Sequence, residues 1–298
     1  MFNEVLVGVD GEQGGRDAVA LATRLTAPTR KLTLAHVYPY HGDPSVRGYD
    51  EHEAVQITRA RRTLQAATEW TRRDTELRWI GAASPGRGLH RLAETMNADL
   101  LVVGSTRRGP FSRVLVGDDT RATLDGAPCA IAIAPAGYAG QTTSIAKVGV
   151  GYDGSADSHR ALITARALAA KLGARLAALE VVVFPSYSFS GPIAGDATLI
   201  ADLVDQARGR VAALGDLEPH AAAGQPAEEL AQWSSSLDLL VVGSRGSGPV
   251  WRLVHPSTSW ELTRHVRCPL LVVPRARRAA ARPDEVLDRL EPAAPSRR

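Results

Sequence analysis

The chain of 298 residues contains few aromatic side chains, few cysteines and no long apolar run. Aromatic residues make up 5% of the sequence, so Ala, Val and Leu must fill its cores. The two cysteines, Cys129 and Cys268, lie far apart and form no cluster of the kind that binds metal. No segment approaches the roughly 20 apolar residues needed to cross a bilayer, and the first residues show no secretory leader. We therefore expect a soluble, reduced, cytoplasmic protein with no membrane partner.

Lysine is also scarce, so the net charge of +3 comes almost wholly from arginine. A protein that binds nucleic acid usually gathers its basic residues on one face. Here acidic residues are interspersed, as where Arg59, Arg61 and Arg62 are followed by Glu69 and Asp74. This pattern is typical of a solvated helix face and argues against nucleic acid as a partner.

Two blocks of the first half recur in the second half in the same order. Residues 5–11 (VLVGVDG) recur as 148–154 (VGVGYDG), and residues 99–105 (DLLVVGS) recur unchanged as 238–244. The offset is 143 residues for the first block and 139 for the second. Repetition in this order and at this spacing indicates a duplicated domain.

Each half is predicted to alternate strands with helices. The first half has strand-like segments, β-branched or continuously apolar, at 4–9, 31–37, 75–81, 99–103 and 130–134. The apolar residues between them repeat at helical spacing, as in Ala18, Leu21, Ala22 and Leu25, and then Ile57, Ala60, Leu64 and Ala67. The second half has a matching stripe at Ile200, Leu203, Ala207, Val211 and Leu214. Its third strand, near 216–222, is interrupted by Pro219.

Strands joined by helices of this length are parallel, with right-handed crossovers. The sequence therefore predicts an α/β fold of two Rossmann-like, doubly wound domains, each with a five-stranded parallel sheet flanked by helices. We expect the first domain at residues 1–140, the second at 141–275, and a disordered Arg/Ala/Pro-rich tail at 276–298. Residues 137–144, rich in Gly, Ala, Thr and Ser, have the composition of a linker.

The most repeated residues fall where this fold places ligands. In open α/β sheets, ligands bind beyond the carboxyl ends of the strands, where the winding direction reverses. If strands one and four are neighbours there, Asp10 meets Gly104 in the first half, and Asp153 meets Gly243 in the second. A carboxylate can accept hydrogen bonds from ribose hydroxyls or an adenine amino group, and glycines let backbone N–H groups approach phosphate. The same residues would equally serve as a helix cap and a chain turn, and their spacing does not separate the two interpretations.

No catalytic or metal-binding motif accompanies these residues. Gly104 and Gly243 each open a G-x-x-x-x-G segment, but proline follows it in place of the lysine that a P-loop requires. No histidine has metal-ligand spacing, and no serine lies in G-x-S-x-G. We therefore expect a protein that is not an enzyme and has no metal site built from its own side chains.

The strand ending in Val-Asp-Gly, the block Asp-Leu-Leu-Val-Val-Gly-Ser and the closing Cys-Pro-Leu-Leu-Val-Val resemble universal stress proteins. The resemblance covers residues 3–136 and 146–274. It implies a tandem form with strand order 3-2-1-4-5 in each half. ATP-binding members of that family carry G-x-x-G, nine residues, and then G-Ser/Thr, and they hold the phosphates between the two ends. The resemblance thus implies an adenine nucleotide, ATP with or without Mg²⁺, as the partner.

The first half carries this motif in an altered form. It keeps Gly104 and Gly117, but Arg107 replaces the second glycine and Asp118 replaces the hydroxyl residue. An aspartate facing the phosphates would repel them unless a nearby arginine or a bridging Mg²⁺ offset its charge.

The second half keeps more of the motif, namely Gly243, Gly246 and Ser257, with Ser259 as a further hydroxyl. Pro256 replaces the third glycine and removes one N–H donor. We therefore expect the second half to be the better site. On the adenine side, the resemblance assigns Asp153, Val181 and Val242 in the second half, and Asp10, Val37 and Val103 in the first. Ser244 joins the candidate site with Gly243, at the end of the fourth strand.

The leading interpretation is a non-catalytic, ATP-binding stress-response or regulatory protein. The alternative is a structural or interaction module of the same fold whose nucleotide motifs have decayed. The resemblance also implies that the last strands of the two halves pair within the chain as a pseudo-dimer. Exposed edge strands would favour further association, and monomer and homodimer are both compatible with the sequence.

Overall fold

The computed structural model describes residues 2–40, 49–105, 127–141, 144–183, 187–188, 191–192, 197–244, 262 and 265–274. The first half contains β1 (Val5–Gly8), α1 (Gln13–Leu25), β2 (Leu32–Pro39), α2 (Tyr49–Ala67), β3 (Thr75–Ala82), α3 (Pro85–Thr95), β4 (Leu100–Gly104) and β5 (Ala130–Ala134). The second contains β6 (Lys147–Gly151), α5 (Ala156–Leu172), β7 (Arg175–Val182), α6 (Ala197–Ala212), β10 (Glu218–Ala223), α7 (Pro226–Trp233), β11 (Leu239–Gly243) and β12 (Leu270–Val273). The two-residue strands β8 (Tyr187–Ser188) and β9 (Gly191–Pro192) form a separate hairpin. The predicted tail, residues 276–298, lies outside the described residues.

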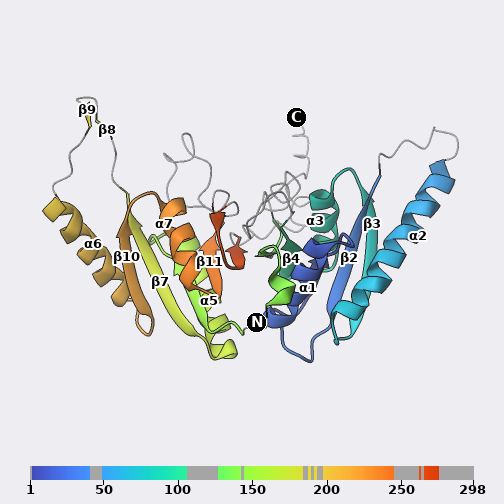
Figure 1. Cartoon of the computed structure of the whole chain (residues 1–298), viewed down its shortest axis with the longest axis horizontal. Helices are drawn as coiled ribbons and strands as arrows, with labels where there is room; N and C mark the ends of the chain where they lie inside the picture. Colours follow the sequence, from blue (N-terminus) through green and yellow to red (C-terminus); the bar gives the residue numbers. More distant parts are fainter. Residues whose placement is uncertain are drawn as a thin grey trace, which may run out of the picture.

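The strands of each half follow the order that the family resemblance implies. The first half reads β3-β2-β1-β4-β5 and the second reads β10-β7-β6-β11-β12, with every pair inside a half parallel. The order 3-2-1-4-5 is therefore confirmed in both. β5 and β12 pair antiparallel, with Leu271 opposite Ala132, so that the halves share one ten-stranded sheet (Figure 1).

Strand β10 forms although it contains Pro219. The N–H of Gly224 donates to the carbonyl of Val182 on β7, so the even-numbered residues of β10 face β7. Pro219 therefore turns its missing N–H outward, at the edge of the sheet, where no ladder bond is lost.

Side chains alternate between the two faces of the sheet, and each face carries its own apolar core. Val5 and Val7 pack with α1 and α2 on one face, whereas Leu6 packs with α3 on the other. The predicted stripe on α1 (Ala18, Leu21, Ala22 and Leu25) is fully buried, as are Ala60, Leu64 and Ala67 of α2. On α6, Ala207 and Val211 are buried and Ile200 and Leu203 are partly buried, as is Leu214 just after the helix.

The segment predicted as a linker is fixed to α1. Residues Tyr138–Gly140 form a short 3₁₀ helix, η2. Asp17 of α1 is fully buried and accepts hydrogen bonds from the backbone N–H groups of Gly137 and Ala139, each at 2.8 Å. The guanidinium of Arg24 lies 4.4 Å from the centre of the Tyr138 ring. These contacts attach the start of the connection to the first half.

The aspartate that opens the repeated DLLVVGS block has a structural role in both halves. Asp99 accepts hydrogen bonds from the backbone N–H groups of Asn3 and Glu4, at 2.8 and 3.2 Å. Asp238 does the same for Ala146 and Lys147, at 2.9 and 2.8 Å. Each acid thus binds the amino end of the first strand of its half, which explains its repetition without a ligand.

Neither cysteine forms a disulfide, and both are buried, as expected of small apolar residues just before the last strands. Burial raises the pKa of the Cys268 thiol to about 12, so it stays protonated at neutral pH. Within the described part of the chain, no helix is long and apolar enough to span a membrane.

Candidate functional site

In the first half, the acid after β1 and the glycine that ends β4 meet at the start of α1. β1 and β4 are parallel neighbours, with Val7 opposite Val102. A Cβ built on Gly14, in the first turn of α1, would lie 3.4 Å from Oδ2 of Asp10 and 3.3 Å from the carbonyl oxygen of Ser105. The Asp10 carboxylate, the start of α1 and the end of β4 therefore lie close together at the carboxyl edge of the sheet.

Asp10 closes the amino end of α1. Its Oδ1 accepts hydrogen bonds from the backbone N–H groups of Glu12, at 2.9 Å, and Gly15, at 3.1 Å. Glu12 occupies the N-cap position but makes no capping bond through its own side chain. The acid outside the helix thus satisfies donors that the cap residue leaves open.

Gly104 is required by packing in this half. A Cβ at this position would lie 2.0 Å from the carbonyl oxygen of Gly14 and 2.5 Å from its carbonyl carbon. The absence of a side chain at Gly104 allows α1 and β4 to approach this closely. The glycine therefore has a structural reason that is independent of any phosphate.

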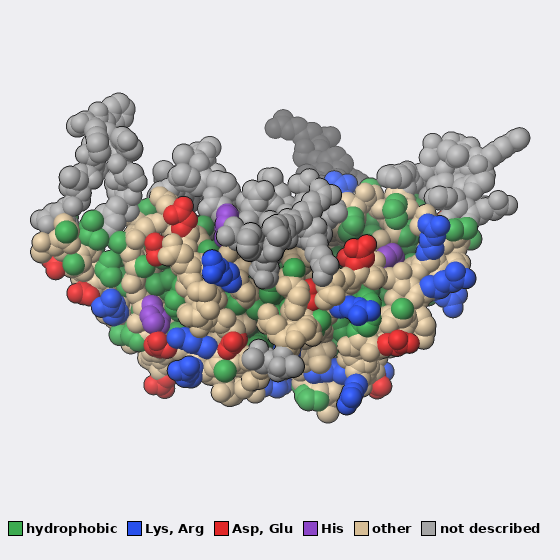
Figure 2. Space-filling view, in the orientation of Figure 1, with side chains coloured by type: hydrophobic (Ala, Val, Ile, Leu, Met, Phe, Trp, Pro, Cys, Tyr) green, Lys and Arg blue, Asp and Glu red, His purple; other side chains and the backbone are tan. Residues whose placement is uncertain are grey.

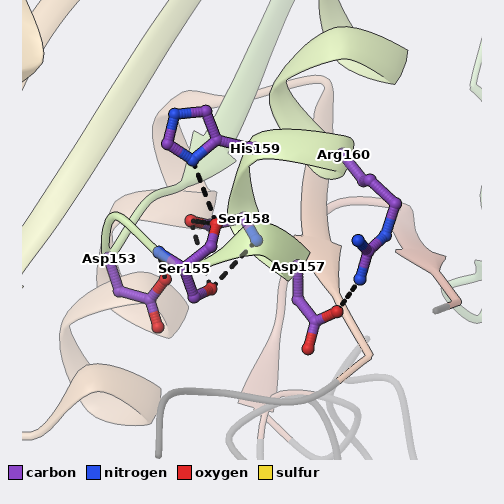
Figure 3. A network of polar contacts seen from close by, with 6 residues as sticks. All are labelled: Asp153, Ser155, Asp157, Ser158, His159 and Arg160. Atoms are coloured by element: carbon purple, nitrogen blue, oxygen red, sulfur yellow. Dashed lines mark hydrogen bonds and ion pairs between the residues drawn. The ribbon is translucent and has the colours of Figure 1, made fainter. Parts of the chain in front are cut away.

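The second half makes the same convergence with different residues (Figure 3). Asp153 accepts a hydrogen bond from the backbone N–H of Ser155 at 3.0 Å. The hydroxyl of Ser155, the N-cap residue of α5, accepts from the N–H of Ser158 at 3.1 Å. A Cβ on Gly243 would lie 2.8 Å from the carbonyl carbon and oxygen of Asp157. β6, β11 and the start of α5 therefore also meet at the carboxyl edge.

The Ser155 cap is a residue that our sequence analysis did not single out, although a signal for it exists. Serine directly before a helical segment is a preferred N-cap, and Ser155 follows the Asp153-Gly154 turn. Around it, Nδ1 of His159 lies 3.1 Å from the Ser155 carbonyl, and Nε2 lies 3.1 Å from the hydroxyl of Tyr152. Burial raises the pKa of Tyr152, which keeps its phenol protonated and able to donate to Nε2.

Asp157 and Arg160 form an ion pair beside this cap, which Figure 3 shows. The Asp157 side chain is 7% exposed and that of Arg160 is 31% exposed. Asp157 occupies the position of Gly14 in the first half, and its backbone faces the strand-end glycine Gly243. The second half therefore places a buried carboxylate at a position where the first half has no side chain.

The four valines assigned to the adenine side lie on the other face of the sheet, with α3 and α7. Val103 and Val242 are buried there, and Val37 and Val181 pack against the same core. A Cβ on Gly151 would lie 3.3 Å from Cγ1 of Val242, so Val242 lies beside the last residue of β6. In each half the structure thus gathers an acid, a strand-end glycine and two valines along one sheet edge.

Several predicted site residues lie outside the described part of the chain. They are Arg107, Gly117, Asp118, Gly246, Pro256, Ser257 and Ser259. Of the two serines that follow the strand-end glycines, Ser105 is 2% exposed and its hydroxyl has no hydrogen-bond partner among the described residues, whereas Ser244 is partly buried.

Two further polar groups near these edges, His36 and Glu180, make contacts within the fold. Nδ1 of His36 lies 2.7 Å from the carbonyl of Val9. At the equivalent position of the second half, Glu180 pairs with Arg210 at 2.5 Å. Among the residues that the structure describes, no three His, Cys, Asp or Glu side chains are grouped as metal ligands. On the face shown in Figure 2, basic and acidic side chains are interspersed.

Comparison with known proteins extends these observations to the whole chain. The model of the universal stress protein family matches residues 1–135 and, a second time, residues 145–274. The chain is 28% identical over 288 residues to a universal stress protein of Mycobacterium tuberculosis (strain ATCC 25618 / H37Rv), an alignment that covers 90% of this chain and 96% of that protein. A second universal stress protein of that strain is 24% identical over 290 residues, covering 91% and 99%.

Two solved structures share the fold over the same extent. A universal stress protein from Archaeoglobus fulgidus DSM 4304 superposes with a TM-score of 0.61 at 20% identity, covering 91% of this chain and 98% of that one. A putative universal stress protein from Pseudomonas aeruginosa UCBPP-PA14 gives a TM-score of 0.58 at 15% identity, covering 92% and 93%.

Proposed function

The chain belongs to the universal stress protein family, and from this premise we propose that it is a non-catalytic regulatory protein that binds adenine nucleotide, chiefly in its second half. The proposed ligand is ATP, with Mg²⁺ where the phosphate charge requires it. Occupancy of the site would report the state of the nucleotide pool to a partner. We propose the cytoplasm as its compartment.

The proposal is supported chiefly by the polar groups at the start of α5, where Ser155 caps the helix and Asp153 is exposed beside it. The hydroxyl of Ser155 caps α5 by accepting from the N–H of Ser158, so that the cap does not rest on the acid. Asp153 is exposed at the end of β6, in the same strand-end cluster as Gly243. An exposed carboxylate at this edge can accept hydrogen bonds from ribose hydroxyls.

The residues present fit an adenine nucleotide on its base and ribose side. Val181 and Val242 offer apolar surface on the sheet face next to Asp153, and the turn at Gly243 and Ser244 follows directly. By the family resemblance, Gly246, Ser257 and Ser259 would hold the phosphates. Bound ATP would bring negative charge to a helix start and a glycine turn, both of which offer backbone N–H donors.

We propose a weaker second site in the first half. Asp10, Val37, Val103 and Gly104 would serve the base and ribose there, and Gly117 would lie on the phosphate side. Asp10 already accepts two backbone N–H groups of α1 through one oxygen. A nucleotide must therefore share this carboxylate with the helix, which lowers the affinity expected of this half.

A second candidate function is a structural or interaction module without nucleotide. Its support is that packing alone explains Gly104 and Gly243, since a Cβ on either would meet backbone atoms of the facing helix. In this reading the two halves, which we place at residues 1–140 and 141–275, act as a pseudo-dimer that uses the β5–β12 pairing to present a surface. The same pseudo-dimer is part of the nucleotide-binding proposal.

The test begins with the full chain purified without added nucleotide. Acid denaturation followed by mass spectrometry identifies any small molecule that is released. The melting temperature is then measured across a Mg-ATP series for the wild type, Asp153→Ala, Asp10→Ala and Asp205→Ala. A ligand present at 100 times its Kd stabilises the folded state by about 2.7 kcal/mol, so binding produces a clear shift.

We expect Asp153→Ala to weaken binding by about tenfold or more, because a hydrogen bond to a charged group is worth roughly 1.5–3 kcal/mol. Asp10→Ala should change the shift much less, and Asp205→Ala, an exposed acid on α6, should leave it unchanged. No released nucleotide together with no Mg-ATP shift would favour the structural module. A larger loss from Asp10→Ala than from Asp153→Ala would assign the better site to the first half.

A further inference from the structure

The two ends of the ten-stranded sheet differ in how they meet solvent. β10 and β3 are the edge strands, at opposite ends of the sheet in Figure 1. β10 has six residues, and Pro219 takes one N–H away from its outer edge. β3 has eight residues and no proline. Short strands and proline protect an edge against pairing with another chain, so β3 is the less protected end.

The backbone groups that β3 turns outward follow from its pairing with β2. The N–H of Leu32 donates to the carbonyl of Asp74, and the N–H of Tyr40 donates to the carbonyl of Ala82. Even-numbered residues of β3 therefore bond to β2, and odd-numbered residues point their N–H and C=O groups away from it. Among the residues that the structure describes, no strand pairs with this outer side.

Two charged residues define how this edge could pair with a second copy of itself. Glu76 and Arg78 form an ion pair on one face of β3, with side chains about half exposed. In an antiparallel pair, outward-pointing residues must face one another, which allows only registers that match odd-numbered residues with odd-numbered ones. Only a few registers of a β3–β3 pair remain, and they differ in which residues lie opposite Glu76 and Arg78.

A pair centred on Leu77 places Glu76 opposite Arg78 of the second copy, and by symmetry does so twice. Shifting the centre by one residue in either direction places Glu76 opposite Glu76, or Arg78 opposite Arg78. Opposite charges across an antiparallel pair stabilise it by about 0.2–1 kcal/mol each, and like charges destabilise it. A centre at Trp79 leaves both charges opposite apolar residues. The strand is therefore complementary to itself in one register.

The same register also covers an exposed aromatic ring. Trp79 is 38% exposed, and the guanidinium of Arg61 lies 5.6 Å from its ring centre. With Leu77 at the two-fold axis, Trp79 lies opposite Thr75 of the second copy. An aromatic residue beside a β-branched one is a favourable cross-strand pair.

We propose that β3 is a homodimerisation edge, at which two copies of the chain join by antiparallel β3–β3 pairing centred on Leu77. The contact is isologous, so it closes after two copies and leaves the protected β10 edges at the outside. It is independent of nucleotide binding, because no residue of the candidate site lies on β3.

Sedimentation equilibrium of the full chain over a range of concentrations tests the proposal. We expect a reversible dimer whose Kd rises about tenfold or more in Glu76→Arg and in Arg78→Glu, since each reversal creates two like-charge pairs. The double variant Glu76→Arg/Arg78→Glu should restore the wild-type Kd. Thr75→Pro, which removes an outward N–H, should weaken the dimer without disturbing the β2 ladder. Asp205→Arg, a reversal on α6, is the matched control and should change nothing.

Three results would overturn the proposal. One is a wild-type chain that stays monomeric at every concentration measured. Another is a dimer that the single reversals leave intact, which would assign association to another surface. The third is a double variant that is folded by circular dichroism yet fails to dimerise.

Discussion

The two halves build the same helix start with different residues, and this is the clearest difference between them. In the first half, Asp10 accepts two N–H groups at the start of α1. In the second half the hydroxyl of Ser155 accepts from Ser158, and Asp153 accepts the N–H of Ser155. The duplicated backbone is preserved while the capping group moves from a carboxylate to a hydroxyl. The N–H of Ser158, the counterpart of the Gly15 N–H that Asp10 accepts, thus donates to the Ser155 hydroxyl.

A second difference concerns the charge inside this first turn. The position two residues after the cap holds Gly14 in one half and the buried Asp157 in the other. The position three residues further on holds Asp17 in the first half, where it binds the connecting segment, and Arg160 in the second, where it pairs with Asp157. One helix is therefore adapted to carry the connection between the halves, and the other to neutralise its own buried acid.

Substituting the strand-end glycines by alanine should cause the largest loss of stability among these predictions. A Cβ at Gly104 would lie 2.0 Å from a backbone oxygen of Gly14, whereas one at Gly243 would lie 2.8 Å from backbone atoms of Asp157. Overpacking a well-packed site costs about 1–3 kcal/mol. We expect Gly104→Ala to reach or exceed the upper end of that range and Gly243→Ala to lie near the lower end. Urea unfolding of the two variants checks this, and equal losses would show that the halves tolerate strain alike.

The strands, the helices and the parallel pairing were predictable from sequence, because the buried strands are continuously apolar and the helices between them keep their 3.6-residue period. The strand order followed from the resemblance to universal stress proteins. The residues that converge on each edge were also predictable, because Asp10 recurs as Asp153 and Gly104 recurs as Gly243 in the repeated blocks. What those residues do was not predictable. The contact between Gly14 and Gly104, for instance, is a distance between backbones and leaves no pattern in the sequence.

The role of Asp17 could not have been predicted for a related reason. Its position inside an amphipathic helix suggests an exposed residue, yet its side chain is fully buried and holds backbone groups 120 and 122 residues away. Such a contact exists only once the start of the connection has folded back onto the first half. Edge strands are a similar case, because the exposure of β3 depends on the order of all ten strands.

The strand-end acids give the next effect in size. Removing Asp10 leaves two donors of α1 without their acceptor, and the loss of an N-cap costs about 0.5–2 kcal/mol. Asp153→Ala should cost less stability, because Ser155 still holds Ser158. We therefore expect Asp10→Ala to lower the unfolding free energy without ligand more than Asp153→Ala does. Ser155→Ala is the matched control, and it should lower the unfolding free energy by about as much as Asp10→Ala does.

The smallest expected effect tests whether the outer strands differ as the helix starts do. The carboxylate of Glu218 on β10 lies 2.9 Å from the Nζ of Lys147 and 2.9 Å from Nε2 of His220. The hydrogen bond from Lys147 lowers the pKa of Glu218 below its ordinary value. In the first half, Glu76 occupies the equivalent register position and pairs with Arg78, while Glu4 stands where the second half has Lys147.

A carboxyl group with a lowered pKa in the folded state stabilises that state above its unfolded pKa, near 4.3, and loses the effect as the pH falls through the folded value. Because Glu218 is largely exposed, the gain should be at most about 0.5 kcal/mol. Glu218→Gln should therefore speed hydrogen exchange in β10 slightly at pH 7 and not at all once the pH lies well below the lowered pKa of Glu218, where both chains are neutral at that position. Exchange in β3 should be the same in both proteins at either pH. A change in β3, or one that persists in acid, would mean that the two edges are coupled through the sheet and that this ion pair does not act on its own strand alone.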